Sequence, residues 1–414
     1  MRICLVAQEY PPDTARGGIG TQTWNKARWL TRLGHQMHVL SASASRSTDV
    51  ETRVEDDVTV HRLPPPSLGL ALYQPETYWL GYSWAVFAEL RRLVERVGFD
   101  LIDFPEYGGE GFVYLLDRTV WDWIPVVVQL HGPLSMFAER IGWPEPSSVF
   151  ARIGSMMEEL AIRRADALMA CSANIADFTA SRHGVRRAAI DVVHCGVDTE
   201  AFRPGPLAER GGRPTVLFVG NIAENKGVGT TLEAVLRLRA RHPDIRLQIA
   251  GKPEEEPVAA LRERIARAGA EANVELLGFV GRSELPALYR GAHLFASPAY
   301  HEVGVANVYI EAMACGCPVV AAGTGGAPEA IRDGESGLLV PPGDAGATAT
   351  AIDRLLSDPA LRRRMGEAGR ARAEEYFGMD HYIKRVLAVY QRALARSRQK
   401  RDLLLDPAGA AAGG

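Results

Sequence analysis

Short apolar runs alternate along the chain with longer segments in which apolar and polar positions recur at helical spacing. The first run, residues 3–7, predicts a buried strand, and the amphipathic segment 21–33 predicts a helix that ends before Gly34. Alternation of this kind is typical of a parallel sheet with helices on both faces. Further strands are predicted at residues 36–41, 101–104, 125–130, 167–170 and 191–194, and further helices at 84–97 and 156–164.

The alternation is interrupted near Phe202, where segments rich in Pro and Gly predict a linker. It restarts at residue 215, so we predict two consecutive α/β domains, each with a doubly wound parallel sheet. The second set of strands is predicted at 215–220, 246–251, 274–277, 294–297, 318–321 and 337–340, and helices at 230–241 and 257–267. The predicted boundaries are 1–203 for the first domain, 204–379 for the second, 380–400 for a C-terminal helix and 401–414 for a disordered tail.

Sheets of this kind bind ligands beyond the carboxyl ends of their strands, and two facing domains would place a ligand in the cleft between them. The first such loop carries Gly17, Gly18 and Gly20 before a predicted helix. Glycines let the backbone approach an anion, and the helix N-terminus offers unpaired N–H groups. A tight turn without a ligand is the alternative interpretation, because a single Gly-rich loop is a weak signal.

The corresponding loop of the second domain carries Asn221 and Lys226. A lysine at this place can reach a phosphate group at the strand end. An exposed lysine in a turn is an equally good interpretation of this feature alone.

The block at residues 297–321 is the most specific feature. A predicted strand ends at Ser297, Glu302 lies in the next loop, and Glu311 lies about two turns into a helix predicted to begin near Val305. Two carboxylates placed in this way can contact different hydroxyl groups of one ligand, and the helix N-terminus can bind phosphate. A capping acid and a surface glutamate are the alternative, which is disfavoured because Glu311 lies inside an apolar stretch.

The composition of the chain excludes several classes of protein. The chain has 414 residues, 47% of them hydrophobic, and a net charge of -3, which argues against a disordered chain and against a dedicated nucleic-acid binder. Its five cysteines are scattered and odd in number, which favours a reducing compartment over a disulfide framework. With no signal-peptide pattern and no apolar run of 18 residues, we expect a cytoplasmic protein.

Taken together, these motifs resemble the retaining nucleotide-sugar glycosyltransferases of family 4, which have the GT-B fold of two Rossmann-like domains facing a cleft. The resemblance covers nearly the whole chain. It implies transfer of a sugar from a nucleotide diphosphate sugar to an acceptor hydroxyl with retention of configuration, in the synthesis of a glycan, glycolipid or glycoconjugate. The matching segments are residues 10–12 with 17–20, 193–202, 219–227, 302–316, and 325–329 with 333–334 and 337–344.

The resemblance also implies roles in the first domain. The glycines of the first loop would approach the donor phosphate and the acceptor. His131 would lie near the donor sugar and the reaction centre, although a histidine at a strand end is more often structural when taken alone. Acceptor choice would lie in loops such as 104–109, where Glu106 and Tyr107 are the candidate contacts.

In the second domain, the resemblance implies that Lys226 neutralises the diphosphate leaving group. Glu302 would contact the donor sugar, and Glu311 would bind the ribose hydroxyls. Backbone amides for the sugar or the phosphate would come from three consecutive residues, Gly304, Val305 and Ala306.

Three departures from the family pattern affect these assignments. Eight residues separate Glu302 from Glu311 where the family has seven, so Val303 stands at the expected place, and we interpret the loop as one residue longer. Asn221 replaces an arginine found in many members, which leaves Lys226 to neutralise more of the diphosphate charge. The amino-acid sequence at residues 307–309 also differs from the one commonest in the family, which indicates a pocket with a different ligand preference.

The chain contains no D-x-D sequence, so we expect no metal and no cofactor, with Lys226 and amide dipoles in the place of a metal ion. A nucleotide-sugar epimerase or a glycosyl phosphorylase on the same fold is the alternative activity, and a non-catalytic nucleotide-sugar binder is a third hypothesis. A dehydrogenase is disfavoured because no G-x-G-x-x-G follows a strand.

The expected partners are a nucleotide-sugar donor and a sugar, lipid-linked or small-molecule acceptor, without nucleic acid. Peripheral contact with the inner face of the membrane is an alternative interpretation of two segments. They are the basic stretch 392–401 and the stretch 68–86, which is rich in Leu, Tyr and Trp. A solvated face and a core helix, respectively, are the favoured interpretations. The donor base, the donor sugar, the acceptor and the oligomeric state stay open.

Overall fold

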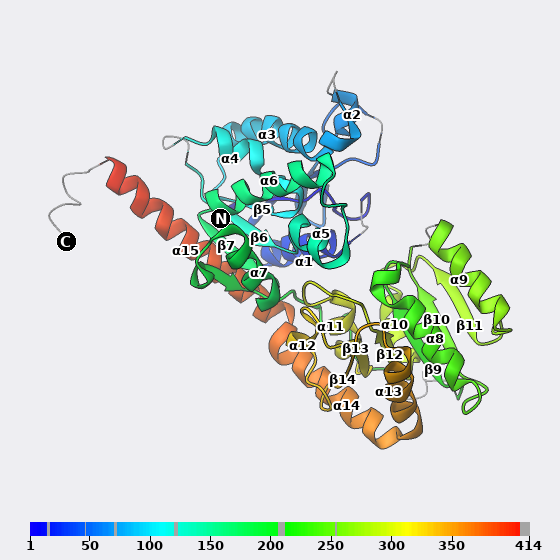
Figure 1. The fold of residues 1–414 in the computed structure, drawn as a ribbon. Coiled ribbons are helices and arrows are strands. Elements are labelled where there is room, and N and C mark those ends of the chain that lie inside the picture. The colour runs from blue at the N-terminus through cyan, green and yellow to red at the C-terminus, as the bar shows by residue number, and fades with distance from the viewer. Residues whose placement is uncertain are drawn as a thin grey trace. The chain divides into compact units, whose positions relative to one another are not determined.

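The structure is a computed structural model that describes residues 1–14, 17–45, 47–69, 73–119, 123–205, 212–252 and 255–405. The chain divides into two compact units (Figure 1). Unit 1 comprises Met1–His194 and Tyr382–Gly414, and unit 2 comprises Cys195–His381. Each unit is a parallel sheet between two layers of helices, which confirms the predicted fold class of two doubly wound α/β domains.

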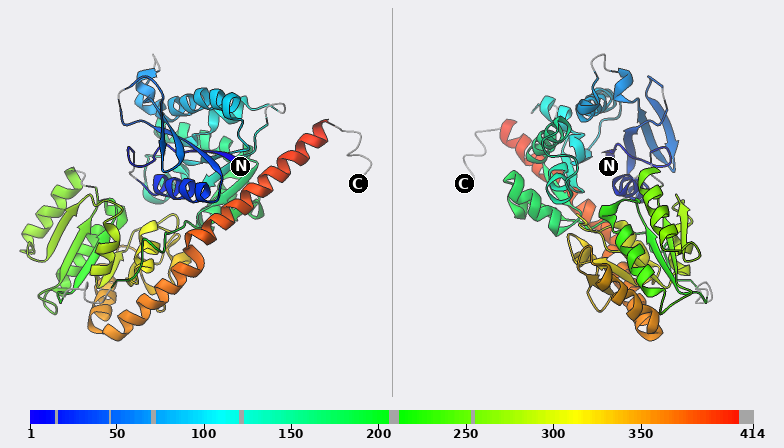
Figure 2. Two further views of the ribbon diagram at one scale, coloured as in Figure 1. Left: turned by 180° about the vertical axis from the view of Figure 1, so that it is seen from behind. Right: turned by 45° about the vertical axis from the view of Figure 1, so that its right-hand side comes forward.

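The sheet of unit 1 has eight strands in the order β3-β4-β2-β1-β5-β6-β7-β8, all parallel except β3. The β3–β4 hairpin, absent from the sequence prediction, forms one edge of this sheet (Figure 2). At the centre, Ile3 of β1 pairs with Leu101 of β5. The strands are β1 Arg2–Val6, β2 Gln36–Ala42, β3 Glu51–Glu55, β4 Val58–Leu63, β5 Leu101–Pro105, β6 Val126–Leu130, β7 Ala167–Ala170 and β8 Ile190–Val192.

Two of the described helices of unit 1, α6 and α7, begin at a serine side-chain cap. Ser172, for example, accepts a hydrogen bond from the N–H of Ile175 at the start of α7. Helices α3, α4 and α6 pack together on one side of the sheet (Figure 1). The helices are α1 Gly18–Arg32, α2 Pro66–Gly69, α3 Tyr78–Val97, α4 Phe112–Asp117, α5 Leu134–Ile141, α6 Val149–Arg164, α7 Ala173–His183 and α15 Met379–Leu405, with 3-10 turns η1 Pro75–Thr77, η2 Tyr107–Gly109 and η3 Arg187–Ala189.

Helix α3 corrects the predicted helix at 84–97, since it begins six residues earlier. In the segment 68–86, Trp79 and Tyr82 are buried, as expected for a core helix, whereas Leu80 and Trp84 of the same helix are exposed. Residues 70–72 of this segment lie outside the described residues.

Unit 2 has a six-stranded sheet, entirely parallel, in the order β11-β10-β9-β12-β13-β14. Helix α13 packs on α8 at one face, and α14 packs on α11 at the other. The strands are β9 Thr215–Val219, β10 Arg246–Ala250, β11 Val274–Gly278, β12 Leu294–Ser297, β13 Val319–Ala322 and β14 Gly337–Val340. The helices are α8 Val228–Leu238, α9 Glu255–Arg267, α10 Leu285–Gly291, α11 Asn307–Ala314, α12 Ala327–Ala330, α13 Ala345–Ser357 and α14 Pro359–Arg372, with the 3-10 turn η5 Glu224–Lys226 and the π-helical turn η6 Ala373–Phe377.

The strand order reverses direction once in each sheet, between β1 and β5 in unit 1 and between β9 and β12 in unit 2. In doubly wound folds the loops at such a switch point separate and leave room for a ligand. The topology therefore directs attention to the loops after β1 and β5 in unit 1, and to those after β9 and β12 in unit 2.

Helix α15 continues without a break from unit 2 into unit 1, and the boundary between the units falls at His381/Tyr382 (Figure 2). Tyr390 donates a hydrogen bond to the buried carboxylate of Asp103 on β5. The same carboxylate oxygen lies 2.6 Å from Nζ of Lys26 on α1. The helix ends at Leu405, five residues into the predicted tail, and residues 406–414 of that tail lie outside the described residues.

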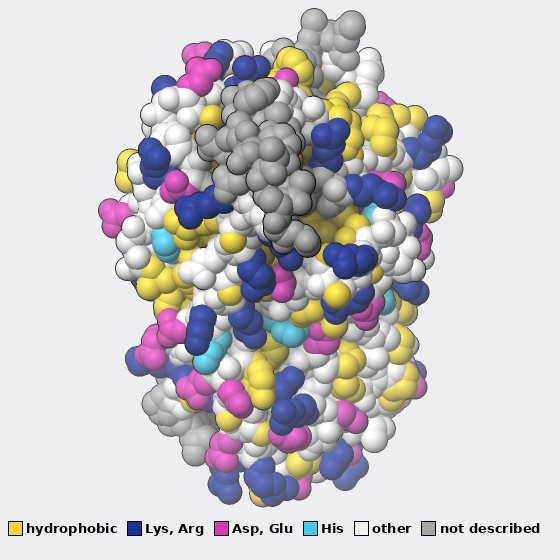
Figure 3. Space-filling model, turned by 90° about the vertical axis from the view of Figure 1, so that its left-hand side faces the viewer, with side chains coloured by type: hydrophobic (Ala, Val, Ile, Leu, Met, Phe, Trp, Pro, Cys, Tyr) yellow, Lys and Arg dark blue, Asp and Glu magenta, His cyan; other side chains and the backbone are white. Residues whose placement is uncertain are grey.

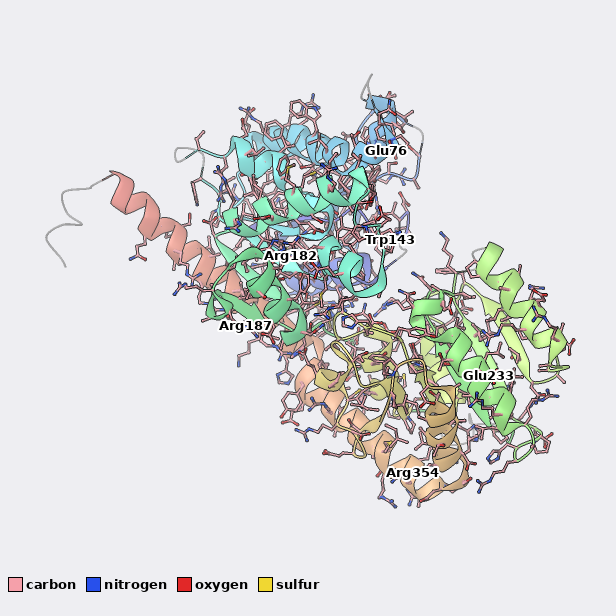
Figure 4. The ribbon with its side chains drawn as sticks, viewed as in Figure 1. Glu76, Trp143, Arg182, Arg187, Glu233 and Arg354 are labelled. Atoms are coloured by element: carbon pink, nitrogen blue, oxygen red, sulfur yellow. The ribbon has the colours of Figure 1, made fainter. Side chains whose placement is uncertain are left out.

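Basic and acidic side chains are interspersed among the described residues of the face drawn in Figure 3. Exposed arginines of unit 1 pair locally, as Arg182 does with Glu139 and Arg187 with Asp177 (Figure 4). Among the described residues, no helix combines the length and the apolar character that a transmembrane segment requires.

Candidate active site

In unit 2, the switch point brings Lys226 and Glu302 together. Lys226 ends η5 in the loop after β9, and Glu302 lies in the loop after β12. Nζ of Lys226 donates to both carboxylate oxygens of Glu302, at 2.9 and 3.2 Å. The lysine side chain is 33% exposed and that of the glutamate 13%, so the pair borders solvent at the carboxyl edge of the sheet.

The two loops approach closely because of a glycine. Gly227 has a φ of +78°, and a Cβ atom there would lie 2.3 Å from the carbonyl oxygen of Pro298. The backbone N–H of Tyr300 also donates to the carbonyl of Asn225. Asn221, the other predicted residue of the β9 loop, is exposed at its start.

Two further glycines, Gly325 and Gly326, support the Glu302 loop from the side of β13. The N–H of Gly326 donates to the carbonyl of Glu302 at 2.8 Å. A Cβ atom on Gly325, whose φ is +59°, would overlap the same carbonyl, at 1.7 Å. Any side chain at Gly325 would therefore displace the backbone that carries the Glu302 carboxylate.

Helix α11 begins at Asn307, two residues later than predicted, and Glu311 is its fifth residue, which places it just over one turn into the helix. Within the described part of the chain, the backbone N–H groups of the preceding segment 304–306 make no hydrogen bond. Gly304 and Val305 are buried, and Ala306 is half-buried at the N-cap position. Unpaired donors before a helix are able to bind a sugar or phosphate oxygen, and the role predicted for them stays a prediction.

The Glu311 carboxylate is buried and has two partners that the sequence did not indicate. Nη1 of Arg282 donates to Oε1 at 2.8 Å, and the hydroxyl of Tyr289 donates to Oε2 at 3.2 Å. Arg282 follows β11 and also lies over the ring of Phe202. Because Arg282 is partly exposed, it joins the candidate ligand-contacting groups of unit 2.

In unit 1, the predicted glycines belong mostly to α1 itself, since the helix begins at Gly18 with Gly17 as its N-cap. Gly20 is buried in the first turn, where a Cβ atom would lie 2.8 Å from the backbone carbonyl of Glu9. This glycine therefore lets the loop after β1 cross the helix N-terminus. Residues 15–16 of the same loop lie outside the described residues.

Two predicted residues of unit 1, Glu106 and His131, are connected by a hydrogen bond from the backbone of His131 to the side chain of Glu106. Oε1 of Glu106 accepts the N–H groups of His131 and Gly132, each at 2.6 Å. The glutamate is fully buried, which raises its pKa to about 7. Burial, with a smaller contribution from the charge of Lys26, lowers the pKa of the His131 imidazole to about 3, so this ring is neutral at physiological pH.

Tyr107, the second predicted acceptor contact, is half-buried in η2, where its ring meets Trp79 edge-on. Two more buried carboxylates hold the loops of this edge. Glu110 accepts the N–H of Gln8 after β1, and Glu158 on α6 accepts the N–H groups of Gly108 and Leu134. Burial raises the pKa of Glu110 to about 8 and that of Glu158 well above its usual value.

These carboxyls predict that the free energy of unfolding falls as the pH rises above 6.5. A group whose pKa is raised by folding stabilises fully below its unfolded value of 4.5, and this stabilisation is lost as the pH rises through the folded value. The histidines with lowered pKa, such as His61, act in the opposite sense but only below pH 6.5. We expect the free energy of unfolding to fall between pH 6.5 and 8, and to fall less steeply in Glu110→Gln. Urea denaturation at each pH measures both slopes, and identical slopes would contradict the assignment.

A cavity of about 530 Å³ lies in unit 2 between the N-termini of α8 and α13. Thr230, Arg264 and Asp344 line it, and Glu233 of α8 also borders it (Figure 4). Lys226, Glu302 and Glu311 are not among the lining residues, although Glu224 and Tyr300 of the same two loops are. In the described part of the chain, no group of three or more His, Cys, Asp or Glu side chains is arranged to hold a metal ion.

Two family profiles match the chain in succession. The profile described as Glycosyltransferase Family 4 matches residues 16–201, and that described as Glycosyl transferases group 1 matches residues 200–372. A curated relative, the D-inositol 3-phosphate glycosyltransferase of Mycobacterium tuberculosis (strain ATCC 25618 / H37Rv), is 31% identical over 406 residues, which cover 93% of this chain and 81% of the relative.

Solved structures show the same fold. Sucrose-phosphate synthase from Thermosynechococcus elongatus superimposes with a TM-score of 0.80 at 22% identity, covering 95% of this chain and 99% of that one. HepE from Anabaena in complex with UDP-glucose gives a TM-score of 0.73 at 21% identity, covering 94% and 98% of the two chains. Both similarities span the two units of this chain.

Proposed function

The chain belongs to the family 4 glycosyltransferases of the GT-B type, and from this premise we propose that it transfers a sugar from a nucleotide diphosphate sugar to an acceptor hydroxyl with retention of configuration. The observation that carries the proposal is the contact of Lys226 with Glu302 at the switch point of unit 2. The donor complex of HepE, which holds UDP-glucose, supports a nucleotide sugar as the donor class.

Departure of the nucleotide diphosphate requires compensation of the negative charge that develops on it. Preorganised cations and amide dipoles supply this compensation, often as the largest single contribution to catalysis. In unit 2, these groups are Lys226 and the unpaired N–H donors of segment 304–306. In the structure, the ammonium group of Lys226 is hydrogen-bonded to the Glu302 carboxylate. A bound diphosphate would therefore compete with this carboxylate for the ammonium group.

The proposed transfer breaks the bond between the anomeric carbon and the diphosphate oxygen. The acceptor oxygen forms a new bond to the same face of the anomeric carbon, and its proton passes to the departing phosphate. His131 is neutral and therefore orients the donor sugar as a hydrogen-bonding group rather than acting as an acid. Glu311, held by Arg282 and Tyr289, is the proposed ligand of the ribose hydroxyls.

Donor screening tests this proposal most directly. We expect one of UDP-glucose, UDP-N-acetylglucosamine, GDP-mannose or ADP-glucose to raise the melting temperature, because a ligand at 100 times its Kd stabilises a protein by about 2.7 kcal/mol. The effect should be lost in Glu311→Ala. If none of the nucleotides shifts the transition, the donor assignment is wrong.

Turnover distinguishes transfer from the alternative activities. We expect nucleotide release that depends on an acceptor. A cyclitol phosphate is the first acceptor to test, because the Mycobacterium tuberculosis relative is a D-inositol 3-phosphate glycosyltransferase. Lys226 takes the place of a metal in this proposal, so EDTA should leave the rate unchanged. An epimerised sugar formed without acceptor, or a rate abolished by EDTA and restored by Mn²⁺, would overturn it.

A further inference from the structure

We propose that two buried glutamates, Glu106 and Glu158, are positioning residues that fix the His131 turn relative to the Tyr107 loop. The inference rests on the proposed function, because it concerns the edge of unit 1 where His131 would meet the donor. It changes the role of Glu106 from a predicted acceptor contact to a residue that acts through its neighbours.

Glu106 links the ends of two adjacent strands. It directly follows β5, and its own N–H donates to the carbonyl of Gln129 on β6 at 3.1 Å. Its Oε1 accepts both N–H groups of the His131–Gly132 turn at 2.6 Å, which are short bonds for this donor and acceptor. Since one oxygen holds both amides, a shift of this atom moves the backbone that carries the imidazole.

Glu158 ties the same turn to the loop after β5. From α6, it accepts the N–H of Leu134 with both oxygens at 2.9 Å and the N–H of Gly108 at 3.0 Å. Leu134 begins α5, two residues after Gly132, and Gly108 follows Tyr107 in η2. The carboxyl group therefore bridges the loop of the predicted acceptor contact and the turn of the predicted catalytic histidine.

Tight packing prevents the loop that contains η2 from shifting. A Cβ atom at Gly108 would lie 2.2 Å from the Trp79 ring, and one at Gly109 would lie 2.4 Å from Met157. Trp79 and Met157 belong to one buried cluster with Leu134. Because η2 cannot move into these neighbours, the lengths of the two glutamate side chains determine where the amides lie.

Neither glutamate forms an ion pair in the described part of the chain, and Oε2 of Glu106 has no hydrogen-bond partner there. Burying a carboxyl group without a cation costs free energy, so its presence at these two positions calls for a structural reason. That reason is side-chain length: an oxygen of glutamate or glutamine reaches the amides, and an oxygen of the shorter aspartate does not. The arrangement thus depends on side-chain length more than on charge.

A length and charge swap tests the proposal in the full-length enzyme. We expect Glu106→Asp, which keeps the carboxyl but shortens the side chain, to lower kcat about 10- to 100-fold, because misplacement of about 1 Å can cost that much. Glu106→Gln, which keeps the reach, should retain kcat within about threefold. Donor Kd should change less than kcat in both variants, because the proposed contacts of the nucleotide, Lys226 and Glu311, lie in unit 2. The reverse order of activities would overturn the proposal, as would equal kcat in all three proteins.

A double variant shows whether Glu106 acts through the histidine. We expect Glu106→Asp combined with His131→Ala to be no slower than His131→Ala alone, whereas independent roles would multiply the two losses. Asp166→Asn is the matched control. Its buried carboxylate accepts the N–H of Val126, at the opposite end of β6, so this variant should lose stability and keep kcat.

A spectroscopic measurement separates this inference from the proposed function. In protein labelled at histidine, the His131 imidazole signal, identified by its loss in His131→Ala, should shift in Glu106→Asp and Glu158→Asp and stay in place in Glu106→Gln. This readout needs no substrate, so an enzyme inactive on every donor would refute the proposed function and still test the positioning. An unmoved signal in both aspartate variants would refute the positioning itself.

Discussion

Lys226→Ala is expected to lower kcat/KM by about 100- to 1000-fold, the usual effect of removing one preorganised donor from a developing oxyanion. Two causes act together. The cation that compensates the leaving diphosphate is lost, and Glu302, otherwise 2.9 Å from the ammonium group, is left as an unpaired carboxylate beside the same site. Acceptor-dependent nucleotide release measures the loss.

The second cause can be isolated. In Lys226→Ala combined with Glu302→Gln, the repulsion is removed, so donor affinity should recover in part while kcat stays low. Lys226→Arg keeps the charge and should retain intermediate activity, and Lys384→Ala removes an exposed lysine of α15 as a matched control. A Lys226→Ala enzyme within tenfold of wild type would show that another group compensates the diphosphate charge.

The strands of unit 2 could be placed to within about one residue because short apolar runs mark them, and β9, β12 and β13 are buried at every position. Strand β12, for example, has the same bounds in sequence and structure, Leu294–Ser297, and all four residues are buried. The β3–β4 hairpin could not be found in this way. Most residues of β3 are exposed on the sheet edge, so its sequence, Glu-Thr-Arg-Val-Glu, has no apolar run to detect.

The same distinction holds at the candidate site. Lys226 and Glu302 each follow a strand and are candidates from the local sequence, and the structure places them in contact. Arg282 and Tyr289 lie 29 and 22 residues from Glu311. Tyr289 reaches it because α10 packs beside α11, and Arg282 reaches it from the loop after β11. Glu158 lies on α6, 50 residues from Gly108, and carries no local signal of its role.

The buried charge cluster of unit 1 should produce the largest change in stability. Lys26 on α1 donates to Asp103 at 2.6 Å and to Gln129 at 2.7 Å, while Tyr390 of α15 donates to the same aspartate oxygen. Lys26→Met leaves the buried carboxylate without its cation, which costs about 3–5 kcal/mol. For a unit of this size, the expected fall in melting temperature is roughly 6–20 °C, measured by differential scanning calorimetry.

Two comparisons test that explanation. Lys26→Met combined with Asp103→Leu removes both charges and should recover most of the loss, whereas Arg163→Met breaks an exposed i,i+4 pair on α6 and should change stability by less than about 1 kcal/mol. A Lys26→Met protein no less stable than Arg163→Met would contradict the buried-pair account. Since the charge of Lys26 also helps to lower the pKa of His131, the same variant should raise the pH at which this imidazole titrates, which links the cluster beside α15 to the His131 turn.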